Sequence, residues 1–190
     1  MSGNVNIIKR YALILLSAWT LLVVGSFVLF YSQHKSNIYE IAKAEARIAF
    51  QKDALYRKWA ARHGGVYVPV TPDTLPNPHL SHIIERDITS PAGKSLTLVN
   101  PAYMTRQVLE LAASEKDFVR GHITSLDPIR PENAPDQWER NALKTFESGL
   151  VEVGEVQVID GQKYMRLMRP FLTEHECLKC HAAQGYKVGV

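Results

Sequence analysis

The feature that most constrains this chain is an uncharged stretch from Tyr11 to Gln33, close to its N-terminus. The centre of that stretch, Leu13 to Phe30, is almost wholly apolar and can cross a hydrocarbon layer of about 30 Å as a single helix. Tyr11 and Tyr31 fall near the two expected interfaces, where aromatic side chains concentrate. The sequence therefore predicts one transmembrane helix over residues 11–33 and a single-span membrane protein.

The residues flanking this helix predict its orientation. Lys9 and Arg10 precede the apolar stretch, and short cytoplasmic segments carry an excess of such cations. We therefore expect residues 1–10 to be cytoplasmic and residues 34–190 to form one domain on the other side. A cleaved signal peptide is the alternative, with Val24-Gly25-Ser26 as a weak small-x-small site, but apolar residues continue past it.

Both cysteines of the chain lie in one motif near the C-terminus, Cys177-Leu178-Lys179-Cys180-His181. In a C-x-x-C-H motif the two thiols form thioether bonds to the vinyl groups of a haem, and the histidine becomes the proximal ligand of the iron. The motif predicts one covalent haem c, held by Cys177 and Cys180 with His181 on the iron. The protein is then a c-type cytochrome.

Two other uses of such a motif are zinc binding and dithiol redox chemistry. A structural zinc site needs four ligands, so histidines such as His79 and His82 would have to supply the second pair. A thioredoxin-like dithiol lies between a strand and a helix of a βαβ unit, and no such unit surrounds Cys177. Covalent haem explains the adjoining His181 better than either alternative.

The haem and the membrane helix predict the same location. Bacteria attach haem c outside the cytoplasm, so the motif requires residue 177 to be exported, which the N-terminal helix achieves. We expect a protein of the bacterial inner membrane with its haem domain on the periplasmic side. The net charge of +3 is mild and evenly spread, so nothing indicates a nucleic-acid partner.

The exported part predicts an α+β domain. A helix is expected from Asn37 to the Gly64-Gly65 pair, and Asp160-Gly161 signals a hairpin turn. Thr173 and Glu176 resemble a capping box that starts the helix of the haem motif. Further helices are expected over residues 100–114 and 136–146, and strands over residues 66–68, 96–99, 122–126, 151–159 and 162–168.

Five strings of the exported part resemble a bacterial family of membrane-anchored, Tll-type haem c domains. They cover residues 63–68, 100–107, 122–126, 130–135 and 177–186. The resemblance implies a PAS-like antiparallel sheet with flanking helices around one haem. In that family the domain commonly precedes histidine kinase, diguanylate cyclase or chemotaxis modules. The present chain stops at Val190, so we expect either a fragment or a protein that passes its state to a partner.

Three residues are candidates for the distal ligand of the iron, which the sequence does not specify. Met104 has suitable chemistry, but its helical spacing with Val108 and Leu111 also suits core packing. His122 is the competing candidate, and His63 is a third. A labile sixth position, open to a small gaseous ligand, is expected.

Arginines are candidates for the haem propionates because a guanidinium binds a carboxylate through two parallel hydrogen bonds. Arg106, Arg130 and Arg166 are the candidates, with Arg169 beside them. The default alternative for each is a solvated side chain or a surface ion pair.

The predicted function is a sensor of redox state or of a small haem ligand. The rival is an electron-transfer cytochrome or an accessory haem subunit of a membrane complex. No catalytic constellation is recognisable, so no enzyme activity is expected. The expected partners are the membrane, a second copy of the chain or another membrane protein.

Overall fold

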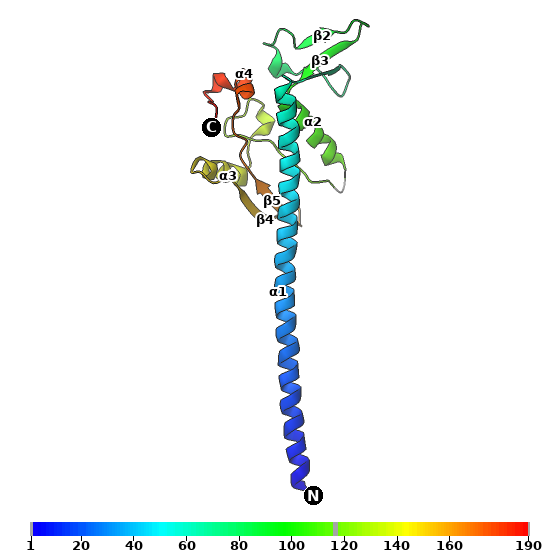
Figure 1. Cartoon of the computed structure of the whole chain (residues 1–190), viewed down its shortest axis with the longest axis vertical. Coiled ribbons are helices and arrows are strands. Elements are labelled where there is room, and N and C mark those ends of the chain that lie inside the picture. The colour runs from blue at the N-terminus through cyan, green and yellow to red at the C-terminus, as the bar shows by residue number, and fades with distance from the viewer. Residues whose placement is uncertain (1, 116–117, 190) are drawn as a thin grey trace. The chain divides into compact units, whose positions relative to one another are not determined.

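The computed structural model of the chain describes residues 2–115 and 118–189. The chain divides into two units, Met1–Ala44 and Glu45–Val190. Helix α1, Ser2–Arg62, begins in the first unit and ends in the second. Figure 1 shows the helices and strands of the whole chain. The mixed helix and sheet content predicted from the sequence is confirmed.

The described residues of the first unit are all helical. Within α1, the apolar stretch makes this the one described helix that is long and apolar enough to cross a membrane, by length and composition. The helix expected from Asn37 does not start there, because α1 continues through that residue. Apolar helix and amphipathic helix therefore form one secondary-structure element.

Helix α1 ends where the two glycines were expected to stop it. Gly64 and Gly65 have φ angles of +73° and +108°, and the amide of Gly65 donates to the carbonyl of Ala60 at 2.9 Å. A Cβ at Gly65 would lie 2.7 Å from Leu98 Cδ1 and 3.0 Å from the carbonyl oxygen of Val99, whereas a Cβ at Gly64 would meet open space. The close approach at Gly65 packs the end of α1 against the following sheet.

These two glycines provide a matched test. Gly65→Ala should lower the free energy of unfolding by about 3 kcal/mol, because backbone strain and the contact with Leu98 add. Gly64→Ala should cost only about 1 kcal/mol, since its side chain meets nothing. Urea unfolding of both variants measures the difference. Equal losses of unfolding free energy in the two variants would show that the contact of residue 65 with Leu98 and Val99 does not affect stability.

The first sheet is antiparallel with the order β1-β3-β2, formed by Val66–Pro69, Ser95–Val99 and Asp87–Thr89. Strand β2 was not predicted, because three exposed residues carry no alternating pattern. The central strand contains Thr97, which is fully buried and donates its hydroxyl hydrogen to Asp87 Oδ1 at 2.7 Å. That bond satisfies a buried polar group and joins the two strands.

Helix α2, Pro101–Ser114, follows the central strand directly and has the predicted bounds. Asn100 caps it by accepting the amide of Tyr103 at 2.9 Å, and Pro101 occupies the first turn. Its buried face is not the predicted one. Tyr103 and Thr105 are buried, and the Tyr103 hydroxyl donates to the carbonyl of Leu75 at 2.7 Å.

A second, separate sheet is the hairpin of β4, Val153–Ile159, and β5, Gln162–Met168. The turn at Asp160-Gly161 has two positive φ angles, +50° and +78°, as this pair of residues predicts. Helix α3, Gln137–Glu147, precedes the hairpin and packs beside it (Figure 1), where Trp138 Nε1 donates to Glu155 Oε2 at 2.8 Å. The hairpin and α3 form one packed group.

The strand predicted over residues 122–126 is wrong. His122 Nδ1 lies 2.9 Å from Glu139 Oε1, and the Thr124 hydroxyl donates to the carbonyl of Asn133 at 2.7 Å. These bonds hold the segment against α3 and the short 3-10 helix η2, Pro131–Asn133. Side-chain contacts replace the strand pairing that the alternating pattern suggested.

The C-terminal segment carries the cysteine motif on short helices. They are η3, His175–Cys177, α4, Leu178–His181, and η4, Ala182–Gln184, and another 3-10 helix, η1, Pro78–Leu80, lies earlier in the chain. The N-cap of η3 is Glu174, so the predicted capping box of Thr173 and Glu176 is wrong by one residue. Thr173 is buried, and its carbonyl accepts the amide of Gly189 at 2.9 Å.

Candidate functional site

Both cysteines and the histidine of the motif line one groove of the second unit. The groove has a cavity volume of about 180 Å³ and is partly open to solvent. Its lining residues come from five segments: Ala54, Arg57, Lys58, Ala61 and Gly64; Leu80 and Ile83; Leu98, Asn100, Pro101 and Ala102; Phe171, Leu172, Glu174 and Glu176; Cys177, Lys179, Cys180 and His181. The fold thus gathers the motif and an apolar wall at one place.

Apolar side chains face the groove while remaining accessible. Phe171 and Leu172 are 43% and 65% exposed, although they lie beside the two cysteines on the groove wall. Leu80, on the same groove, is buried. Covering the exposed apolar surface with a large apolar ligand would be favourable.

The imidazole of His181 is held in one orientation. Its Nδ1 lies 2.6 Å from Gln184 Oε1, so Nδ1 carries the proton and donates to that oxygen. The amide nitrogen of Gln184 donates in turn to the carbonyl of Asp127 at 2.8 Å, and the Tyr186 ring contacts the imidazole edge to face. This tautomer leaves the Nε2 lone pair free, as an axial haem ligand requires.

The two thiols are free and partly buried, so they are available for thioether formation. Burial raises the pKa of Cys180 above its ordinary value of 9.0, and the neighbouring Cys177 raises it further. Cys180 is therefore a neutral thiol at pH 7. In the described part of the chain, no group of three or more His, Cys, Asp or Glu side chains is arranged to hold a metal ion. The two thiols, the oriented imidazole and the apolar walls fit a covalently bound haem.

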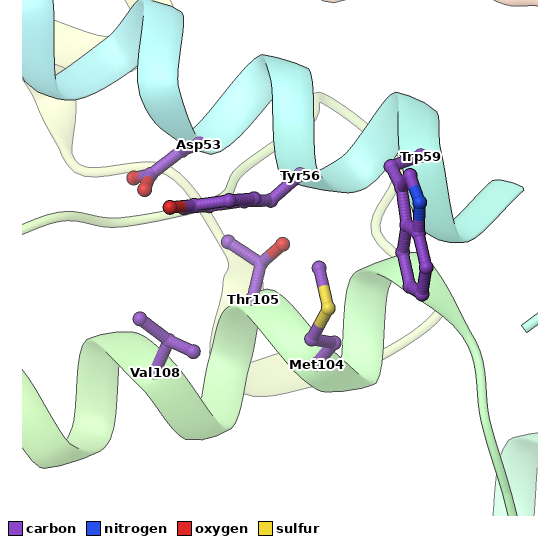
Figure 2. Close-up of a pocket in the computed structure, with 6 residues that line it drawn as sticks. All are labelled: Asp53, Tyr56, Trp59, Met104, Thr105 and Val108. Atoms are coloured by element: carbon purple, nitrogen blue, oxygen red, sulfur yellow. The ribbon is translucent and has the colours of Figure 1, made fainter. Parts of the chain in front are cut away.

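Met104, a candidate distal ligand, lines a different and smaller pocket. Figure 2 shows Asp53, Tyr56 and Trp59 of α1 facing Met104, Thr105 and Val108 of α2. None of these six residues lines the groove that contains His181. The coordination of iron by Met104 stays a prediction.

His122, the second candidate, lies in an ionic cluster at the start of α3. Glu139 is its partner at 2.9 Å and is 7% exposed. The same carboxylate accepts the amide of Asp136 at 2.9 Å and lies 3.3 Å from Arg166 Nη2. His63, the third candidate, bonds the carbonyl of Trp59 through Nδ1 at 2.8 Å. Neither histidine lines the groove, and their roles as ligands also stay predictions.

The arginines predicted to bind propionates lie elsewhere and have acidic partners. Arg106 Nε lies 3.6 Å from Glu110 and Arg130 Nε lies 3.3 Å from Glu132. Arg166 pairs with Asp136 at 2.7 Å and stacks on Trp138, and Arg169 Nε lies 3.7 Å from Glu152. None of the four lines the groove.

Sequence reasoning missed Arg57, Lys58 and Gln184. Helix α1 contributes two cationic side chains to the groove, Arg57 and Lys58. The spacing of Ala54, Arg57, Lys58 and Ala61 is i, i+3, i+4, i+7, which places all four on one helix face. The available signal in the sequence was this cationic helix face flanked by alanines. It does not stand out, because it is part of the longer amphipathic pattern of α1.

The His122–Glu139 pair predicts a specific pH dependence. The hydrogen bond to Glu139 raises the pKa of His122 above its ordinary value of 6.5, so the stabilisation is complete below that value and is lost as the pH rises through the folded pKa. Burial raises the pKa of Glu139, but hydrogen bonds from His122 and from the Asp136 amide outweigh it, and the net pKa lies below 4.5. The carboxylate's contribution is therefore present above 4.5 and is lost as the pH falls through its folded pKa.

Urea unfolding at several pH values tests this prediction. As the pH rises from about 6.5 through the folded pKa of His122, the wild type should lose stability that His122→Gln does not lose. His82→Gln is the control, because His82 is exposed and its ring makes no hydrogen bond within the described residues. Parallel pH profiles for wild type and His122→Gln would contradict the prediction.

Comparison with known proteins identifies one family. The family model described as Tll0287-like matches residues 34–187. This range includes the cysteine motif and every residue that lines the groove. No curated protein and no solved structure matches the chain. The matched range covers most of the sequence, and the chain belongs to the Tll0287-like family.

Proposed function

We propose that this chain is a membrane-anchored domain that carries one haem c and senses its redox state or a small molecule bound to its iron. Cys177 and Cys180 hold the haem through thioether bonds, and His181 is the proximal ligand. The observation that carries the proposal is the groove in which both thiols, the oriented imidazole and apolar walls meet. When bound, haem supplies a reversible one-electron change and a coordination position.

The proposal includes the fold family and the location. Membership of the Tll0287-like family supports a PAS-like fold, although the two antiparallel sheets are separate in the described residues. The apolar N-terminal helix supports a membrane anchor. Lys9 and Arg10 before it support a domain outside the cytoplasm, in the periplasm at the inner membrane.

Helix α1 favours sensing over simple electron transfer. The same helix supplies groove residues Ala54, Arg57 and Ala61 and the candidate membrane span. A change of charge or ligation at the haem would act directly on these groove residues. An electron-transfer cytochrome needs no such response, because its haem only relays the electron.

The test uses the full chain matured by cells that attach haem c. Haem staining of a denaturing gel and a pyridine haemochrome assay should show one covalent haem per chain. Hydrogen exchange over residues 45–62 should then differ between the oxidised, reduced and carbon monoxide-bound states. Covalent haem with identical exchange in all three states would instead identify an electron carrier, and absence of covalent haem would refute the proposal.

A further inference from the structure

One wall of the groove is a helix face that combines small residues with two cations. Ala54 and Ala61 lie one turn on either side of Arg57 and Lys58, and all four line the groove. Alanines let a flat group approach the helix closely, since they extend little beyond the backbone. Arg57 and Lys58 are the two charged residues of this face, and their partners decide which of them is open to an anion.

The two cations differ in their partners. Lys58 Nζ lies 3.4 Å from Glu174 Oε1, and both side chains are 48% exposed. Arg57 stacks its guanidinium 4.7 Å from the centre of the Phe171 ring, and its Nη1 donates a hydrogen bond to Thr105 Oγ1 at 3.4 Å. Among the described residues no carboxylate lies within ion-pair distance of Arg57. Only one of its five N–H donors has a partner there.

The electrostatic surroundings of Arg57 offset its burial only in part. Burial lowers the pKa of Arg57, while the negative charges of Cys177 and Asp53 raise it. Burial raises the pKa of Asp53 in turn, which weakens that compensation. A partly buried cation with unused donors is a site for an anion.

We propose that Arg57 is the anion-binding residue of the groove, where its guanidinium holds a carboxylate of the haem or a small anion bound beside it. The assignment rests on the proposed function, because it places the anion next to the haem of Cys177 and Cys180. Both sources share one chemistry, a negative oxygen or nitrogen that accepts a charge-assisted hydrogen bond. Arg57 then takes the role that the sequence suggested for Arg106, Arg130 and Arg166.

The experiment compares Arg57→Gln with the matched variant Lys58→Gln in the haem-loaded full chain. Azide and imidazole are titrated into the ferric protein and followed by the Soret band, and resonance Raman spectra report the haem propionates. If the anion is exogenous, Arg57→Gln should weaken azide binding by about tenfold or more while imidazole binding stays within about threefold. If the anion is a propionate, azide binding stays unchanged, the propionate bending bands shift and the midpoint potential falls.

Further variants keep the assignment falsifiable. Arg57→Lys retains the charge without the fork, so it should fold and recover part of either effect. The assignment is overturned if Arg57→Gln changes neither azide binding nor the propionate bands, or if Lys58→Gln produces the same changes. Wild-type protein without covalent haem would refute the proposed function, and this outcome is recognised separately by the haem stain.

Discussion

Replacing Cys177 and Cys180 together by alanine is expected to remove all covalently bound haem. The chain has only these two cysteines, so no other thiol can form the thioether bonds. Single variants should retain one bond and give a weaker stain. Haem staining of denaturing gels, normalised to protein, measures the loss, and the pyridine haemochrome spectrum distinguishes one thioether from two.

Two histidine variants serve as controls for this result. His175→Ala changes an exposed residue of η3 that does not line the groove, and it should keep the haem. His181→Ala should keep the covalent bonds but change the visible spectrum, because the proximal ligand is lost. A haem stain that persists in the double cysteine variant would refute the attachment. Stoichiometric zinc in place of haem would favour the alternative reading of the motif.

Glu139→Ala is expected to lower the free energy of unfolding by about 3 kcal/mol, because it removes a buried carboxylate that accepts hydrogen bonds from charged and backbone groups. Glu139 is 7% exposed and serves three groups: His122, Arg166 and the amide of Asp136. The substitution also removes half of the capping box of α3. Chemical denaturation near pH 7 measures the loss.

The matched control is Glu147→Ala at the other end of the same helix. Glu147 is exposed and has no ion pair within the described residues, so the same substitution should change the unfolding free energy by less than about 0.5 kcal/mol. The haem stain of Glu139→Ala should persist, because its cluster does not line the groove. Equal effects of the two substitutions would show that the Glu139 cluster does not stabilise the domain.

Local signals in the sequence predicted the boundaries of most elements. These signals act through their own backbone angles or through hydrogen bonds to residues close in the chain. They are Gly64-Gly65 after α1, Asn100-Pro101 before α2 and Asp160-Gly161 between β4 and β5. Such effects do not depend on the rest of the fold. The strand prediction for residues 122–126 was wrong because that segment depends on distant partners. These partners are Glu139 and Asn133, which the local sequence does not reveal.

By itself, the sequence determined the cysteine motif, the apolar N-terminal helix and the short-range caps and turns, because each depends on residues that are neighbours in the chain. Only the tertiary structure decided which distant side chains share the groove with His181. It placed Arg57 there and placed Met104 and Arg166 elsewhere. The physical reason is that the neighbours in the chain of Arg57, Met104 and Arg166 do not specify which distant side chains each of them will contact. The packing of α1 and α2 against the segment 171–181 determines which face meets the groove.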